Sequence, residues 1–103
     1  MILNNKKRIS VDFSTKQTTT ELVSGSGGKK ICVTDINLYI SGAAVIKLMS
    51  NNREIYRNEV SAAGMVDLLG VDLPGDGGKN LNIDISADVN VRGNIYYYED
   101  LVG

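Results

Sequence analysis

The chain has 103 residues, of which 43% are hydrophobic and 22% are charged, and its formal net charge is −1. This length suits one domain with a single core, and the near-zero charge disfavours binding to nucleic acid or to an anionic membrane surface. The sequence has no histidine and a single cysteine, Cys32. It therefore lacks the commonest metal ligand and proton shuttle and cannot form an internal disulfide. We expect no enzyme activity and no cofactor.

The N-terminal segment, residues 1–8, is polar and basic after its first three residues. It lacks the apolar run that a signal peptide requires, and no stretch of the sequence approaches the roughly 20 apolar residues of a membrane span. We therefore expect a chain that is made in the cytoplasm and has no membrane partner, with residues 1–8 forming an arm. Ile9, Val11 and Phe13 then alternate with polar residues and predict a first strand.

Residues 18–23 are rich in threonine and predict an edge strand, which a glycine- and serine-rich turn ends. A second strong strand, the third in chain order, is predicted from Lys30 to Ser41. Ile31 and Val33 make its first half apolar on both faces, and two explanations are open. Either a β-bulge shifts the alternation near Asp35, or another chain covers that end of the strand.

The middle of the chain predicts a hairpin, with strands over residues 44–49 and 54–60 around the turn-forming pair Asn51-Asn52. The second of these strands has few apolar residues and is expected at an edge. Between Met65 and Leu73 the apolar phase changes at Leu69-Gly70, which indicates a bulge or a kink. Residues 74–80 form a glycine-rich loop.

The clearest pattern runs from Leu81 to Tyr98, where one set of alternate positions is apolar throughout and the other is polar as far as Asn94. This period of two predicts extended chain with one face in a core. Because a single strand of that length is unusual, we expect a hairpin that turns near residues 87–90. About eight short strands and no predicted helix indicate an antiparallel sandwich or barrel, formed as a single domain by residues 9–103.

Three groups of residues invite a functional interpretation, and for each a structural one is favoured. The Gly25–Lys30 stretch lacks the spacing of a phosphate-binding loop, and a hairpin loop is expected. Oxygen ligands for calcium are conceivable, but solvated strand and turn positions explain them better; they are Asp67, Asp72, Asp76, Asp84 and Asp88. Cys32 has no histidine partner and is expected to be a small buried side chain.

Tyr96, Tyr97 and Tyr98 are the only place where aromatic residues enter the polar phase of the last strand. If Tyr97 continues the core face, Tyr96 and Tyr98 point outward. Exposed tyrosines are favoured at protein contacts, and the alternative is an aromatic pair that covers a sheet edge.

Two long segments carry a resemblance to a known family: TTTELVSGSGGKKICVTDINLYISGAAVIKLMSNNREIY and LPGDGGKNLNIDISADVNVRGNIYYYE. In order they contain a threonine-rich segment, a lysine-led strand (Lys30 to Ile40), a short hairpin, a glycine-rich connection and a closing alternating segment (Leu81 to Tyr97). Together they resemble the small jelly-roll structural proteins of tailed bacteriophages. These residues define a fold pattern and not a chemical motif.

The resemblance implies a jelly-roll β-sandwich without catalytic activity, located in the virion. A head-fibre module or a small tail domain is possible, but a homotrimeric capsid decoration or cement protein that binds the major capsid protein is favoured. Four residues are then candidates for a subunit or capsid contact: Ile31, Val33, Tyr96 and Tyr98. The alternative function is a receptor- or carbohydrate-binding knob.

Overall fold

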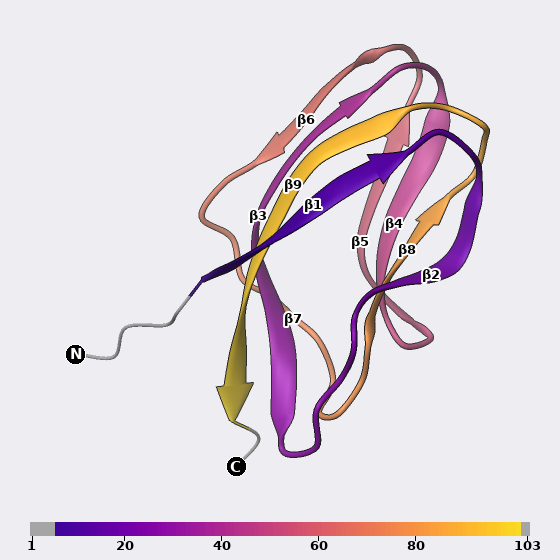
Figure 1. The fold of residues 1–103 in the computed structure, drawn as a ribbon. Coiled ribbons are helices and arrows are strands. Elements are labelled where there is room, and N and C mark those ends of the chain that lie inside the picture. The colour runs from indigo at the N-terminus through magenta and orange to yellow at the C-terminus, as the bar shows by residue number, and fades with distance from the viewer. Residues whose placement is uncertain (1–5, 102–103) are drawn as a thin grey trace.

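The computed structural model describes residues 6–101, which form nine strands and no helix. The strands make two antiparallel sheets that pack face to face as a sandwich (Figure 1). The five-stranded sheet consists of β1 (Lys7–Phe13), β9 (Val91–Leu101), β3 (Lys29–Ile40), β6 (Gly64–Leu68) and the two-residue β7 (Leu73–Pro74). The four-stranded sheet consists of β2 (Gln17–Val23), β8 (Leu81–Ile85), β4 (Ala44–Ser50) and β5 (Arg53–Val60).

The strand order is that of a jelly roll. It reads β1-β9-β3-β6 in one sheet and β2-β8-β4-β5 in the other, while β7 pairs with β3 beside β6. Most connections cross from one sheet to the other, as Figure 1 shows, and the β4–β5 hairpin turns within one sheet at Asn51, whose φ is 53°. Such double-sheet closure is typical of jelly rolls. The predicted all-β sandwich of jelly-roll type is thus confirmed, with β7 added to the eight expected strands.

Alternating side chains from both sheets build the core. On β4, Ala44, Ile46 and Leu48 are buried while the residues between them are partly exposed. The last segment behaves in the same way, since its odd positions are buried as the alternation predicts; these are Leu81, Ile83, Ile85, Val91, Ile95 and Tyr97. Burial of this apolar area is the main favourable contribution to folding.

The predicted hairpin within Leu81 to Tyr98 is wrong. β8 pairs with β2 and β4 in the four-stranded sheet, whereas β9 pairs with β1 and β3 in the five-stranded sheet. The residues between them, 86–90, carry the chain from one sheet to the other. The alternation keeps its phase because both strands turn the same set of side chains toward the shared core.

The connection between β2 and β3 also differs from the expected hairpin loop. The Gly25–Lys30 stretch links strands of different sheets and lies against the β7–β8 connection (Figure 1). The Gly25 amide donates a hydrogen bond to Asn80 Oδ1 over 2.6 Å, and the Gly78 amide donates to the Lys29 carbonyl over 2.7 Å. The glycines thus allow two backbones to lie in contact.

The predicted arm, residues 1–8, overlaps the first strand. β1 begins at Lys7, which pairs with Tyr97, and Arg8 pairs with Tyr96. Residues 1–5 lie outside the described residues.

A β-bulge in β3 resolves the double-faced apolar pattern at its start. The register of β3 against β9 shifts between Val33 and Asp35. Ile31 and Val33 therefore face the core before the bulge, and Ile36, Leu38 and Ile40 face it afterwards. Of the two explanations that the sequence left open, the bulge is the one found.

The predicted edge strands and the predicted kink are also found. β2 and β5 are the two edges of the four-stranded sheet. Between β6 and β7, Gly70 has a φ of 65°, a left-handed conformation that glycine adopts at little cost. Gly93 in β9 has a φ of 148°, and a Cβ there would overlap the backbone oxygen of Asn37. The described residues contain no helix that is long and apolar enough to cross a membrane.

Candidate functional site

Two of the four predicted contact residues are in the wrong place for a contact. The side chains of Ile31 and Val33 are 3% and 0% exposed and belong to the core cluster of this single chain. Their apolar character serves the interior because the bulge turns them inward. They have no surface to offer a partner.

Tyr96 and Tyr98 lie on the outer face of the five-stranded sheet and are half-buried. Tyr98 is engaged within its own chain, since its hydroxyl lies 3.4 Å from Asp72 Oδ1, to which it donates a hydrogen bond. Its hydroxyl is also hydrogen-bonded to Cys32, and this contact, together with burial and the charge of Asp72, raises the pKa of Tyr98 to about 12. Of the four predicted residues, Tyr96 thus retains the freest side chain.

Cys32 is the register partner of Tyr98 across β3 and β9 and is 1% exposed. Burial raises the pKa of its thiol, and the hydrogen bond with Tyr98 opposes that rise only in part. A buried thiol that stays protonated is a poor nucleophile. Cys32 is therefore a packing residue, as the sequence predicts.

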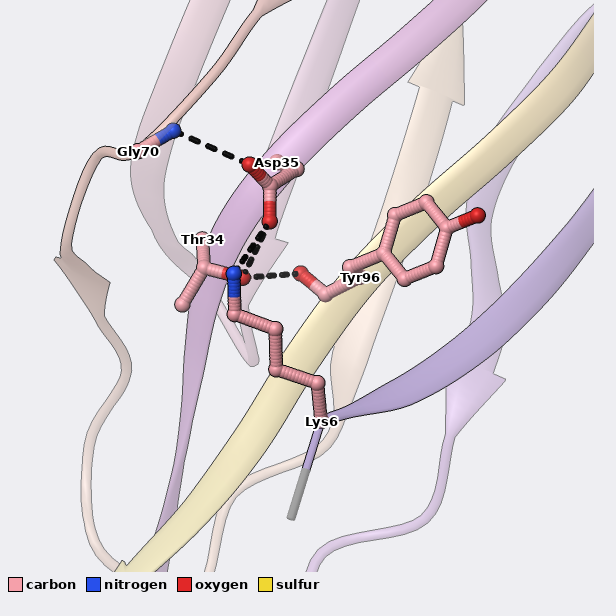
Figure 2. A network of polar contacts seen from close by, with 5 residues as sticks. All are labelled: Lys6, Thr34, Asp35, Gly70 and Tyr96. Carbon is pink, nitrogen blue, oxygen red and sulfur yellow. Dashed lines mark hydrogen bonds and ion pairs between the residues drawn. The ribbon is translucent and has the colours of Figure 1, made fainter. Parts of the chain in front are cut away.

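A polar network holds the connection after β6 against β3 (Figure 2). One oxygen of Asp35 accepts a hydrogen bond from the Gly70 amide over 2.9 Å, and the other accepts from Thr34 Oγ1 over 2.8 Å and from Lys6 Nζ over 3.0 Å. Figure 2 shows Lys6 reaching across β9 to this carboxylate, while the ring of Tyr96 points away from it. These hydrogen bonds, with that from Gly70 the strongest, lower the pKa of Asp35 from 3.8 to about 2.

The aspartates considered as calcium ligands have separate roles. Asp84 accepts a hydrogen bond from the Thr19 amide, Asp88 accepts one from the Lys16 amide over 2.8 Å, and Asp76 pairs with Arg53 over 3.0 Å. Within residues 6–101, no three acidic or cysteine side chains lie close enough to hold a metal ion. These three carboxylates instead make contacts within their own chain, two with backbone amides before or within β2 and one with Arg53.

Three of the four exposed large apolar side chains among residues 6–101 lie on or beside β6, and they were not identified from the sequence. Tyr39, Met65 and Leu69 are 43%, 57% and 74% exposed; together they form what we call the β6 patch. Tyr39 and Met65 are register partners on the outer face of the five-stranded sheet. The sequence contains a signal for this patch. Residues 66 and 68 are the alternate positions expected to face the core, and Met65 and Leu69 are apolar although they do not belong to that set.

β6 is also the least protected sheet edge. Edge strands are normally guarded by charges or bulges against pairing with another chain. β5 carries four charged residues, β2 has two register irregularities, and β1 carries Lys7, Arg8 and Asp12. β6 has one charge, Asp67, whose carboxylate accepts a hydrogen bond from Asn37 Nδ2. An unpaired, mostly apolar edge beside exposed side chains is an arrangement suited to protein contact.

Comparison with models of protein families, with curated proteins and with solved structures finds no match to this chain. The fold therefore defines the class, an all-β jelly-roll sandwich.

Proposed function

We propose that the chain is a non-enzymatic structural protein of a bacteriophage virion, a decoration or cement protein that binds the assembled head as a homotrimer. The observation that carries the proposal is the β6 patch, an apolar and nearly uncharged edge on an otherwise guarded sandwich. The jelly-roll strand order and the resemblance of residues 18–99 to small phage structural proteins support it.

The β6 patch is the proposed contact between neighbouring copies. A ring of three copies needs a heterologous contact, in which the patch meets a different surface of the next copy. The β1 edge is the proposed counterpart, because Lys7 and Arg8 complement Asp67 in charge. β1 and β6 run in opposite directions in the sheet. Because rotation about an axis parallel to the strands keeps their directions, β6 of one copy lies antiparallel to β1 of the next.

Binding to the assembled head is the proposed activity. A protein that binds only the assembled shell stabilises it by mass action, and three linked copies strengthen weak individual contacts through avidity. Tyr96 is the proposed contact to the major capsid protein, since it lies on the outer face and its ring points away from the Asp35 network.

Particle composition tests the role in the virion. Purified particles of the phage that encodes the chain are analysed by quantitative mass spectrometry, and the proposal expects many copies per particle. Absence from the particles, or a few copies confined to the tail, would overturn the decoration role.

The mass in solution tests the contact between copies. Sedimentation equilibrium is expected to give three times the 11.1 kDa mass of one chain. Met65→Lys, which places a charge in the patch, is expected to give monomers. Leu101→Lys is the matched control, because Leu101 is 74% exposed and pairs with Lys29 at the far end of β3. A wild-type monomer, or equal dissociation by both substitutions, would refute the proposed contact.

A receptor- or carbohydrate-binding module is the second candidate function. A hollow on the outer face of the four-stranded sheet, whose lining includes charged and hydroxyl side chains, supports it.

A further inference from the structure

The outer face of the four-stranded sheet contains a hollow of about 280 Å³. It opens on the side of the sandwich opposite to the β6 patch and the Asp35 network. Residues from β2, β4, β5 and β8 line it, together with Lys16, which precedes β2; the lining consists of Lys16, Gln17, Thr18, Val45, Lys47, Arg57, Asp84, Ile85 and Ser86.

A bulge in the edge strand β2 forms one rim of this hollow. The register of β2 against β8 is irregular between Gln17 and Thr20, and Thr19 has a φ of 48°. Asp84 stabilises this conformation by accepting a hydrogen bond from the Thr19 amide. A non-glycine residue in the left-handed region is energetically unfavourable, and such conformations cluster at binding sites.

The charges of the hollow favour an anion. Lys47 lies between Arg57 on β5 and Asp84 on β8 in the register of the sheet. Arg57 is already paired with Glu54 and Glu59. The ion pairs found within residues 6–101 involve neither Lys16 nor Lys47. Two cations are thus available to a ligand in a hollow that contains one carboxylate.

The neutral polar groups of the hollow are donors as well. Ser86 Oγ accepts a hydrogen bond from the Val45 amide over 2.7 Å, which leaves the hydroxyl hydrogen of Ser86 able to donate to a ligand. Thr18 adds a second hydroxyl on the rim. A set of ammonium and hydroxyl donors matches a ligand rich in oxygen acceptors.

A second, shallower hollow of about 470 Å³ continues from the first and shares Val45 and Ser86 with it. Small apolar side chains contribute to its lining, among them Ala43, Ala44 and Val60, beside Ser61 and Glu59. The two hollows form a trough with a cationic end and a partly apolar end. An extended ligand with a charged group and weakly polar faces fits this combination.

We propose that this trough binds an acidic saccharide. The carboxylate of one sugar unit pairs with Lys16 and Lys47, because charge-assisted hydrogen bonds are the strongest contacts available there. The Ser86 hydroxyl donates to a sugar oxygen, and the next unit lies over Ala43 and Val45. The inference does not depend on the role in the virion, since it concerns the opposite sheet.

Titration calorimetry with a galacturonic acid trisaccharide tests the proposal, with its methyl ester and sodium sulfate as comparison probes. The acid is expected to bind, and more weakly as salt is raised, while the ester is expected to bind at least about tenfold more weakly. Equal binding of the ester, or no binding of the acid, would overturn the proposal. Equal binding of sulfate would overturn the saccharide assignment in favour of a general oxyanion site.

Substitutions locate the site. Lys47→Gln is expected to weaken binding of the acid by about tenfold. Lys79→Gln is the matched control, because Lys79 is an exposed lysine in the β7–β8 connection and does not line the hollow. Both side chains point away from the core, and an unchanged melting temperature confirms folding. An equal loss in the two variants would place binding elsewhere and refute the site.

Discussion

Removing the charge of Asp35 should destabilise the fold in a pH-dependent way. The fall in its pKa from 3.8 to about 2 corresponds to about 2 kcal/mol of folding free energy, at about 1.4 kcal/mol per pKa unit. The Asp35 side chain is 15% exposed, so solvent screens a small part of this energy. Asparagine keeps an acceptor for the Gly70 amide but loses the charge that faces Lys6. We expect Asp35→Asn to lower the free energy of unfolding at pH 7 by about 1 to 2 kcal/mol.

The sign of the pH dependence follows from the lowered pKa. The carboxylate stabilises the folded state above its ordinary pKa of 3.8, and this stabilisation is lost as the pH falls through about 2. Urea unfolding followed by circular dichroism at pH 7, 4 and 2 measures it. The wild type and Asp35→Asn should converge at pH 2. Asp12→Asn is the control, because Asp12 also pairs with a cation, Arg92, but is 77% exposed. If the free energy of unfolding of Asp35→Asn is lower than that of the wild type by the same amount at pH 2 as at pH 7, the electrostatic reasoning is refuted.

Three further predictions concern single positions. Gly93→Ala should lower the free energy of unfolding by about 3 kcal/mol or more, since the added Cβ would overlap the backbone of β3. Gly27→Ala is the control, because open space surrounds Gly27, and it should change this free energy by less than about 0.5 kcal/mol. Spectrophotometric titration should find a tyrosine that ionises near pH 12, and this ionisation should be absent from Tyr98→Phe. Because the pKa of Tyr98 is raised in the folded state, the free energy of unfolding of the wild type should fall as the pH rises from 10 towards 12. Tyr98→Ala should also speed the reaction of Cys32 with a thiol reagent. Asn82→Leu should raise the unfolding free energy by about 1 kcal/mol in urea denaturation, because the Asn82 Oδ1 atom is buried without a partner. An unchanged titration in Tyr98→Phe, or a loss of stability in Asn82→Leu, would contradict these local assignments.

The burial of side chains was predictable from the sequence, and the pairing of strands was less so. The alternation in Leu81 to Tyr98 correctly places the odd residues of β8 and most of those of β9 in the core, with Ala87 and Val89 packed against it. It cannot distinguish a hairpin from a crossover between two sheets, because both keep the same face toward the core. The short polar stretch at residues 86–90 suits either connection. The resemblance to phage proteins supplied the jelly-roll class, whereas the order of the strands is known only from the structure.

The candidate sites depend on contacts between residues far apart in the chain. Asp35 meets Gly70 and Lys6, which are 35 and 29 residues away, and no local pattern predicts such a meeting. Ile31 and Val33 lie in the core and not at a contact, because the bulge after Val33 moves residues between faces without changing composition. The hollow beside Lys47 likewise depends on the irregular register of β2.

The pairing of β1 with β9 has a consequence for the kinetics of folding. These strands are joined in register from Lys7↔Tyr97 to Phe13↔Val91, so the edge of the five-stranded sheet closes a loop of nearly the whole described chain. Closing long loops costs entropy before any contact is gained, and sheets built from distant strands fold in about milliseconds to seconds. The β4–β5 hairpin, joined by a two-residue turn, is expected to form early. During synthesis, β1 and β3 must wait for β9, the last strand, before the five-stranded sheet can form.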